Sequence, residues 1–255
     1  MLPPSEGKTP PTGRARPLDL ASLSSPGLGV ARAEVVDALL RLGDGPEAIR
    51  TLGLGARNAS EAGWNLRLHN APAAPASRVY TGVLYGAAGL DDLPTPAARR
   101  RAARQVRIIS GLWGALSPAD RIPAYRLSMG ASLPGVGPLA RFWRPRLTAE
   151  LAGTSGLVVD CRSADYRAAW HPGPGTTAVQ VRVERAHKGE RTVISHDAKR
   201  SRGALVGHLL RRAGTSPRTP EALAAAAAER VGDLWAGVEL RGDDGGAQTL
   251  VLITQ

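Results

Sequence analysis

Glycine and proline recur along the whole of this chain and limit how long any helix or strand can be. The 255 residues include 30 glycines and 20 prolines. Glycine favours turns, and proline interrupts both helix interiors and central strands. No apolar run approaches the roughly 20 residues that a membrane-spanning helix needs. Because a chain of this length can still bury a core, we expect a fold of many short elements rather than a helical bundle.

The spacing of apolar residues predicts a mixed α/β (α+β) fold. Helical periodicity is found at residues 31–42, 96–109, 138–151, 199–213 and 219–231. Alternating or β-branched patterns predict strands at residues 156–161, 177–184, 190–195, 234–240 and 248–254. Turn residues at 187–189 and 242–245 predict two hairpins between these strands. We expect one domain over residues 1–255 with a central mixed sheet. Within this domain, residues 1–30 are expected to form an extended N-terminal segment.

The chain is strongly basic. It carries 33 Lys and Arg against 22 Asp and Glu, a formal net charge of +11, and its three lysines are Lys8, Lys188 and Lys199. The preference for arginine, with so much Ala, Gly and Pro, is typical of a GC-rich genome. That preference does not explain the excess of positive charge, which creates a field that favours polyanions. Nucleic acid or another phosphate-bearing partner is therefore expected, and solubility alone is the alternative explanation.

One cysteine, Cys161, excludes a disulfide framework and favours a reducing compartment. Residues 1–11 lack the apolar stretch of a signal peptide, so we expect a cytoplasmic protein with no membrane partner. Cys161 ends an apolar strand, which is typical of a buried thiol, and a reactive thiol beside Arg162 is the alternative. The five histidines show no ligand spacing, so neither a metal site nor a cofactor is expected.

Residues 133–140, Leu-Pro-Gly-Val-Gly-Pro-Leu-Ala, match the turn of a helix-hairpin-helix-like element. Gly135 and Gly137 permit a tight turn that exposes backbone N–H groups at a helix N-terminus. Such groups bind a DNA phosphate without reading bases, and Arg141 follows at once. Residues 125–132 do not look like a first helix, so an ordinary helix-capping loop is the alternative interpretation.

Two further clusters carry lysine. Lys199, Arg200 and Arg202 open a predicted helix, where cations oppose the helix dipole, so a bound anion would explain them; a solvated basic face is the alternative. Residues 5–9, Ser-Glu-Gly-Lys-Thr, end like a phosphate-binding loop but lack its first glycine, since position 2 is leucine. We expect instead a rigid loop that holds a buried or functional Lys8.

Taken in order, these segments resemble the YaaA-type peroxide stress protein family, in an actinobacterial-like form. The matching stretches are residues 5–9, 80–82, 109–118, 125–130, 142–143, 163–166 and 198–203. The resemblance implies a mixed α/β fold of its own type with a positively charged cleft, DNA binding, and a role in limiting iron-driven peroxide damage. It also implies that Lys8, Arg126, Lys199 and Arg202 line the cleft. Relatives usually place a short apolar strand before Pro3, so either the natural start lies upstream or an edge strand is missing.

Two functional hypotheses follow. In the first, the protein binds DNA non-specifically through Gly135, Gly137, Arg126, Arg141, Lys199, Arg200 and Arg202. In the second, it is an enzyme acting on a nucleotide, a nucleobase or a small phosphorylated substrate. The candidate catalytic residues are then Lys8, Glu6, Tyr166 and Lys199, because a lysine and a carboxylate in a closed cleft can do acid–base work. An open groove as wide as a duplex favours the first, and a narrow internal pocket favours the second.

Overall fold

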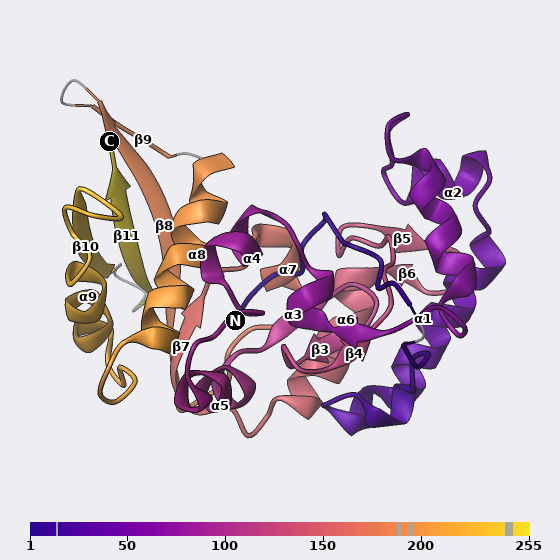
Figure 1. Ribbon diagram of the computed structural model, residues 1–255, viewed down its shortest axis with the longest axis horizontal. Helices are drawn as coiled ribbons and strands as arrows, with labels where there is room; N and C mark the ends of the chain where they lie inside the picture. The colour runs from indigo at the N-terminus through magenta and orange to yellow at the C-terminus, as the bar shows by residue number, and fades with distance from the viewer. Residues whose placement is uncertain (14, 188–189, 194–195, 243–246) are drawn as a thin grey trace.

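The computed structural model describes residues 1–13, 15–187, 190–193, 196–242 and 247–255, and it confirms a mixed α/β fold (Figure 1). The α-helices are α1 (Gly29–Leu42), α2 (Pro46–Thr51), α3 (Ala76–Val79), α4 (Val83–Ala88), α5 (Pro96–Gln105), α6 (Leu139–Glu150), α7 (Ala164–Ala168), α8 (His196–Arg211) and α9 (Pro220–Ala228). The 3-10 helices are η1 (Leu20–Ser22), η2 (Pro26–Leu28) and η3 (Ala59–Arg67). The strands are β1 (Ala74–Pro75), β2 (Ile108–Ser110), β3 (Gly114–Leu116), β4 (Arg121–Ile122), β5 (Ser132–Leu133), β6 (Gly137–Pro138), β7 (Gly156–Asp160), β8 (Thr176–His187), β9 (Glu190–Val193), β10 (Gly237–Gly242) and β11 (Gln248–Thr254).

The main sheet is mixed, as expected, with the strand order β10-β11-β8-β7. Strands β7, β8 and β11 run parallel, whereas β10 is antiparallel to β11 and β9 to β8. The long strand β8 pairs with β7 along its first half and with β9 along its second. Val179, Val181 and Val183 alternate into the core along β8, which is the period of two that a strand requires. The predicted terminal hairpin is confirmed as β10 and β11.

Met1 and Leu2 join this sheet to the β2–β3 hairpin. The backbone of Met1 bonds to Val159 and Cys161 at β7, and Leu2 pairs in parallel with Ile108 of β2. Met1 and Leu2 therefore make strand-like contacts with both neighbours, at the place where the resemblance implies a short strand. Because the chain then leaves the carboxyl edge of the sheet, residues 3–9 lie where the sites of α/β proteins collect.

The expectation of an extended segment over residues 1–30 was wrong in part. The first two residues pair with strands, η1 and η2 follow later, and α1 begins at Gly29. Burial explains the difference, because Leu23 and Leu28 enter the core and fold the chain back against it. Among the described residues, no helix combines the length and the apolar character needed to cross a bilayer.

Helices α4 and α8 touch through backbone. A Cβ added at Gly203 would lie 2.1 Å from the carbonyl oxygen of Leu84, and one at Gly207 would lie 2.8 Å from that of Ala88. Only glycine permits so close an approach. The contact partners rise together along both helices, so α4 and α8 run parallel, and the first turn of α4 lies beside Gly203, about two turns into α8. Gly203, which directly follows Arg202, is thus needed for the packing of α8 against α4.

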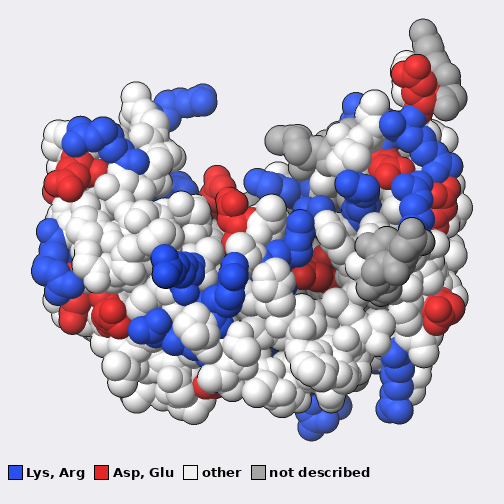
Figure 2. All heavy atoms as spheres, turned by 180° about the vertical axis from the view of Figure 1, so that it is seen from behind, with Lys and Arg blue, Asp and Glu red and all other residues white. Residues whose placement is uncertain are grey.

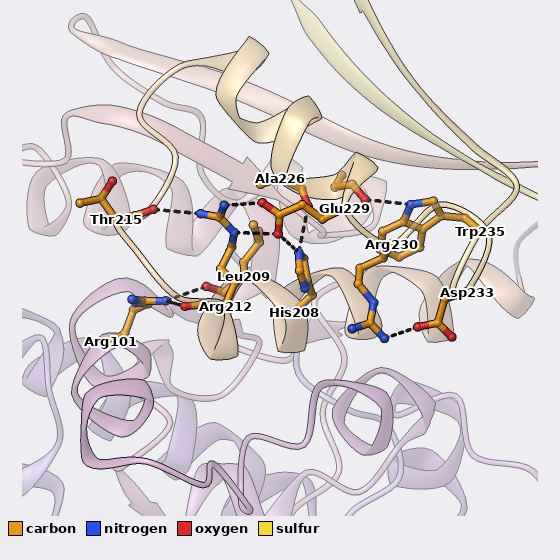
Figure 3. Close-up of polar contacts among 11 residues, drawn as sticks. Arg101, His208, Leu209, Arg212, Thr215, Ala226, Glu229, Arg230, Asp233 and Trp235 are labelled. Carbon is orange, nitrogen blue, oxygen red and sulfur yellow. Dashed lines mark hydrogen bonds and ion pairs between the residues drawn. The ribbon is translucent and has the colours of Figure 1, made fainter.

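Polar contacts anchor the other end of α8 (Figure 3). The guanidinium of Arg101 donates to the carbonyl of Leu209 at 3.1 Å and to that of Arg212 at 2.9 Å, where unpaired C=O groups and the helix dipole favour a cation. Glu229, just after α9, accepts from Arg212 at 2.5 Å and lies 3.1 Å from Nε2 of His208. These contacts fix the C-terminal end of α8, while its first turn lies at the upper edge of the molecule in Figure 1.

Candidate functional site

The glycine-rich turn is a β-hairpin that leads into α6, so the expected helix-hairpin-helix-like element is not confirmed. Strands β5 and β6 flank the turn, and Gly135 and Gly137 have positive φ of 79° and 82°. Upstream there is no helix, because Tyr125, Leu127 and Met129 alternate into the core and impose an extended path. The two glycines and Arg141 remain at the surface or near it, in the turn and in the first turn of α6.

Lys8 is buried in a loop at the carboxyl edge of the sheet. Its side chain is 8% exposed, and Nζ donates to the carbonyls of Ser5 at 2.7 Å and Glu6 at 3.5 Å. The same nitrogen lies over the ring of Tyr125, 4.4 Å from its centroid. The loop is tied to the start of α4, since Ser5 Oγ accepts from the N–H of Gly82 at 2.8 Å.

Burial, and secondarily the nearby charge of Arg126, lower the pKa of Lys8 from 10.5 to about 7. Among the described residues, no carboxylate forms an ion pair with its amine. A substantial share of the Lys8 amine is therefore neutral near pH 7. A neutral amine is both a base and a nucleophile.

A hydrogen-bonded chain of hydroxyls lies beside Lys8. The hydroxyl of Tyr125 is 2.8 Å from that of Tyr80 and 2.7 Å from Oγ of Ser110. Ser110 Oγ accepts from two backbone N–H groups, so its own proton goes to Tyr125, and Tyr125 then donates to Tyr80. Burial raises the pKa of Tyr125 to about 12, and it also raises the pKa of Tyr80 well above its usual value. Both tyrosines are neutral at physiological pH, so the basic group of this site is the amine.

Arg126 is hydrogen-bonded to the backbone of the Lys8 loop. Its guanidinium forms an ion pair with Glu61 and donates to the carbonyl of Glu6 at 2.5 Å. Its backbone exchanges two hydrogen bonds with the side chain of Asn65, at 2.8 and 2.9 Å. The charge of Arg126 is therefore already compensated by a carboxylate that sequence reasoning missed. Nothing in the spacing of residues 61 and 126 signals this pair.

Glu6 and Tyr166 also come to this loop. The carboxylate of Glu6 is exposed, and the half-buried hydroxyl of Tyr166 accepts from the N–H of Met129 at 3.3 Å. Burial raises the pKa of Tyr166, with smaller contributions from the negative charges of Glu6 and Asp165. Three of the four candidate catalytic residues are thus neighbours, although they come from the N-terminal loop and α7.

The basic cluster at the start of α8 divides into two kinds of residue. Lys199 and Arg200 are exposed, and neither forms an ion pair among the described residues. Arg202 is half-buried and donates from Nε to the carbonyl of Val181 at 3.0 Å, so it fastens α8 to β8. Lys199 lies one turn before Gly203 on the same face of α8, and because Gly203 is beside the first turn of α4, Lys199 lies just before the start of that helix.

The strand end at β7 holds a buried ion pair. Asp160 accepts from Arg162 at 2.7 and 2.9 Å, and both side chains are almost wholly buried. The neighbouring Cys161 is also buried, and burial raises the pKa of its thiol to about 11. A thiol with this pKa is protonated and inert, so the structure favours the buried interpretation. In the parts of the chain that the structure describes, no cluster of His, Cys, Asp and Glu is arranged to hold a metal ion.

Seen from behind, the upper edge of the molecule is hollowed between the end that carries α1 and α2 and the end that carries the main sheet (Figure 2). Lys and Arg side chains lie on both sides of this hollow, which we call the upper cleft. The first turn of α8 rises at this edge in Figure 1. A separate cavity of about 720 Å³ lies between the ends of α5 and α6 and the later part of α8, and none of the predicted site residues lines it.

Comparison with known proteins agrees with the resemblance. A sequence model of the family described as "Peroxide stress protein YaaA" matches residues 1–230. A UPF0246 protein of Streptomyces coelicolor is 46% identical over 227 residues, which cover 88% of this chain and 86% of the relative. A UPF0246 protein of Corynebacterium efficiens is 39% identical over 260 residues, covering 99% and 98% of the two chains. The chain therefore belongs to the YaaA family of peroxide stress proteins.

Proposed function

We propose that the protein binds DNA without sequence preference along the upper cleft and so serves the response to peroxide. The observation that carries this proposal is the pair of exposed cations, Lys199 and Arg200, near the start of α8. Cations near a helix N-terminus are unfavourable by about 0.3–1 kcal/mol each. A bound phosphate would make the two cations favourable for stability, because the helix dipole, the N–H groups and both side chains all attract an anion there.

The overall charge supports the same proposal. An excess of 11 positive charges gives affinity for any polyanion, and phosphate contacts need no base readout. The hairpin at Gly135 and Gly137 and the exposed Arg141 at the start of α6 would supply further phosphate contacts. DNA covered in this way would be less accessible to iron-driven oxidation, which connects binding with the family's peroxide role.

The test is fluorescence anisotropy with duplex, bubbled and single-stranded DNA of one length. We expect the Lys199→Ala/Arg200→Ala variant to bind more weakly to all three. The matched control is Arg104→Ala/Arg218→Ala, which removes the same charge from exposed positions near the other end of α8, roughly 24 Å away for a 16-residue helix. Equal weakening by both variants would show only a general charge effect and would contradict a site at the start of α8.

A second function is favoured by one specific observation, the buried amine of Lys8 with its pKa near 7 beside the tyrosine chain. This arrangement suits acid–base or nucleophilic chemistry on a nucleotide or a small phosphorylated substrate. Thermal-shift measurements with nucleotides and sugar phosphates, run on the wild type and on Lys8→Met, test it. Stabilisation of the wild type alone supports this function, and an identical response of both proteins argues against it.

A further inference from the structure

We infer that Lys8 forms an imine with the aldehyde of an abasic deoxyribose in DNA held along the upper cleft. The inference rests on the proposed DNA binding and gives the buried lysine of that site a substrate. Imine formation requires an unprotonated amine, an approach to the amine that is too narrow for an intact nucleotide, and a surface that binds the flanking phosphates.

The contacts of Lys8 suit a nucleophile. A neutral amine has two N–H groups and one lone pair, and the carbonyls of Ser5 and Glu6 accept N–H groups at 2.7 and 3.5 Å. The lone pair is then left for a substrate. Tyr125 contacts the amine with its ring and not with its hydroxyl, which is engaged with Tyr80 and Ser110. Burial keeps the pKa of Lys8 near 7, so the amine is available at physiological pH.

Access to the amine selects against an intact nucleotide. Only 8% of the Lys8 residue is exposed, although Glu6 and Gly7, which precede it in the loop, are exposed. A planar base would need a wide pocket, whereas a sugar that has lost its base is smaller and exposes an aldehyde at C1′ when its ring opens. Attack by peroxide-derived radicals on DNA produces such sites, so this substrate class agrees with the peroxide role of the family.

The flanking phosphates have a matching surface. Gly203 lies beside the first turn of α4, which begins directly after Gly82, and Lys199 lies one turn earlier on the same face of α8. The N–H of Gly82 in turn donates to Oγ of Ser5 in the Lys8 loop. A backbone whose phosphate contacts Lys199 and Arg200 therefore passes next to the loop that carries the amine.

The chemistry balances without an oxidant or a metal. The Lys8 nitrogen attacks C1′, and the carbinolamine loses water to give the imine. Removal of a C2′ proton then breaks the C3′–O bond, so the phosphate leaves and the strand is cut on the 3′ side. Glu6, whose negative charge acts on both Lys8 and Tyr166, is the nearby exposed carboxylate that would take this proton. Water hydrolyses the imine and regenerates the amine.

The test uses the full chain and a labelled duplex with one abasic site, in the presence of sodium cyanoborohydride. The reductant converts an imine into a stable secondary amine, so a protein–DNA adduct appears on a denaturing gel. Peptide mass spectrometry then locates the adduct, which is a short search because the chain has three lysines and one terminal amine. We expect the adduct on Lys8, and a loss of about tenfold or more in Lys8→Met.

The controls separate this inference from DNA binding itself. A duplex with a tetrahydrofuran analogue has no aldehyde, so it should bind with the same affinity in anisotropy but give no adduct. Binding of the abasic duplex without any adduct on Lys8, or an adduct confined to Lys199, overturns the inference and leaves the proposed function intact. Absence of binding overturns both. Circular dichroism of Lys8→Met shows whether the variant is folded, and an equal adduct yield from the folded variant also overturns the inference.

Discussion

Replacing Lys8 by methionine should change how the stability of the protein depends on pH. The two side chains have similar length, but methionine has no charge to bury beside Tyr125. The pKa of Lys8 is 10.5 in its ordinary environment and about 7 in the folded protein. Between these values the unfolded chain keeps a proton that the native state has released, so the stability of the wild type rises with pH. Lys8→Met lacks this contribution.

The magnitude follows from the two pKa values of Lys8. Each pKa unit corresponds to about 1.4 kcal/mol, so full protonation of the buried amine costs the native state about 5 kcal/mol below pH 6. Raising the pH from 6 to 9 relieves roughly half of this cost, or about 3 kcal/mol. The lost hydrogen bond to Ser5 adds an offset of about 1 kcal/mol, mostly independent of pH.

Urea unfolding of both proteins at pH 6 and pH 9 measures this effect. The stability difference between Lys8→Met and the wild type should shift in favour of the wild type by about 3 kcal/mol over that range. Taking the difference between the two proteins cancels every other titrating group. A difference that stays constant with pH would show that the amine is charged throughout, which refutes the assignment of Lys8 as a neutral nucleophile or base.

Two further changes test the fold that positions the site. Gly203→Ala places a Cβ 2.1 Å from the carbonyl of Leu84, so we expect a loss of about 1–3 kcal/mol in chemical denaturation, whereas Gly29→Ala in α1, where nothing lies within 4 Å, should change stability by less than about 0.5 kcal/mol. Equal effects would contradict the close packing of α4 and α8. Asp160→Ala leaves the buried charge of Arg162 unpaired and should cost about 3–5 kcal/mol, and a neutral result would show that the pair is solvated.

Elements with local periodicity could be predicted from the sequence. The helices at α5, α6, α8 and α9 and the strands β7, β10 and β11 all lie where apolar spacing places them, because one buried face is enough to reveal each. Pro145 lies inside α6 without ending it. The β2–β3 hairpin at residues 108–116 could not be predicted, since three-residue strands are too short to show a period.

Long-range contacts could not be predicted. Arg32 would be read as a surface cation, yet it is buried and donates from Nε to the carbonyl of Trp113 at 2.9 Å. Glu61 pairs with Arg126 across a separation of 65 residues. The glycine pattern at 133–140 fitted a helix-hairpin-helix turn locally, but the alternating burial upstream, a tertiary effect, decided against the first helix.

The Lys8 site could be predicted from the sequence only in part. Its loop, its lysine and Tyr166 were identified as candidates from their residue types, whereas the roles of Ser110 and Tyr125 depend on a hydrogen-bonded chain that only the fold assembles. Arg202 was expected to hold phosphate, but in the structure it fastens α8 to β8. Residue type therefore indicated the chemistry of the site, and packing decided which cations stay available for a partner.

If DNA phosphates contact Lys199 and Arg200 near the start of α8, binding must weaken as salt is added. Anisotropy titrations of a duplex at a series of salt concentrations give the slope of log K against log[salt], which falls by about 0.9 for each phosphate contact. We expect a steep slope for the wild type, a slope shallower by about 2 for Lys199→Ala/Arg200→Ala, and the wild-type slope for Arg104→Ala/Arg218→Ala. Binding with no salt dependence, or a slope that Lys199→Ala/Arg200→Ala leaves unchanged, would contradict these phosphate contacts.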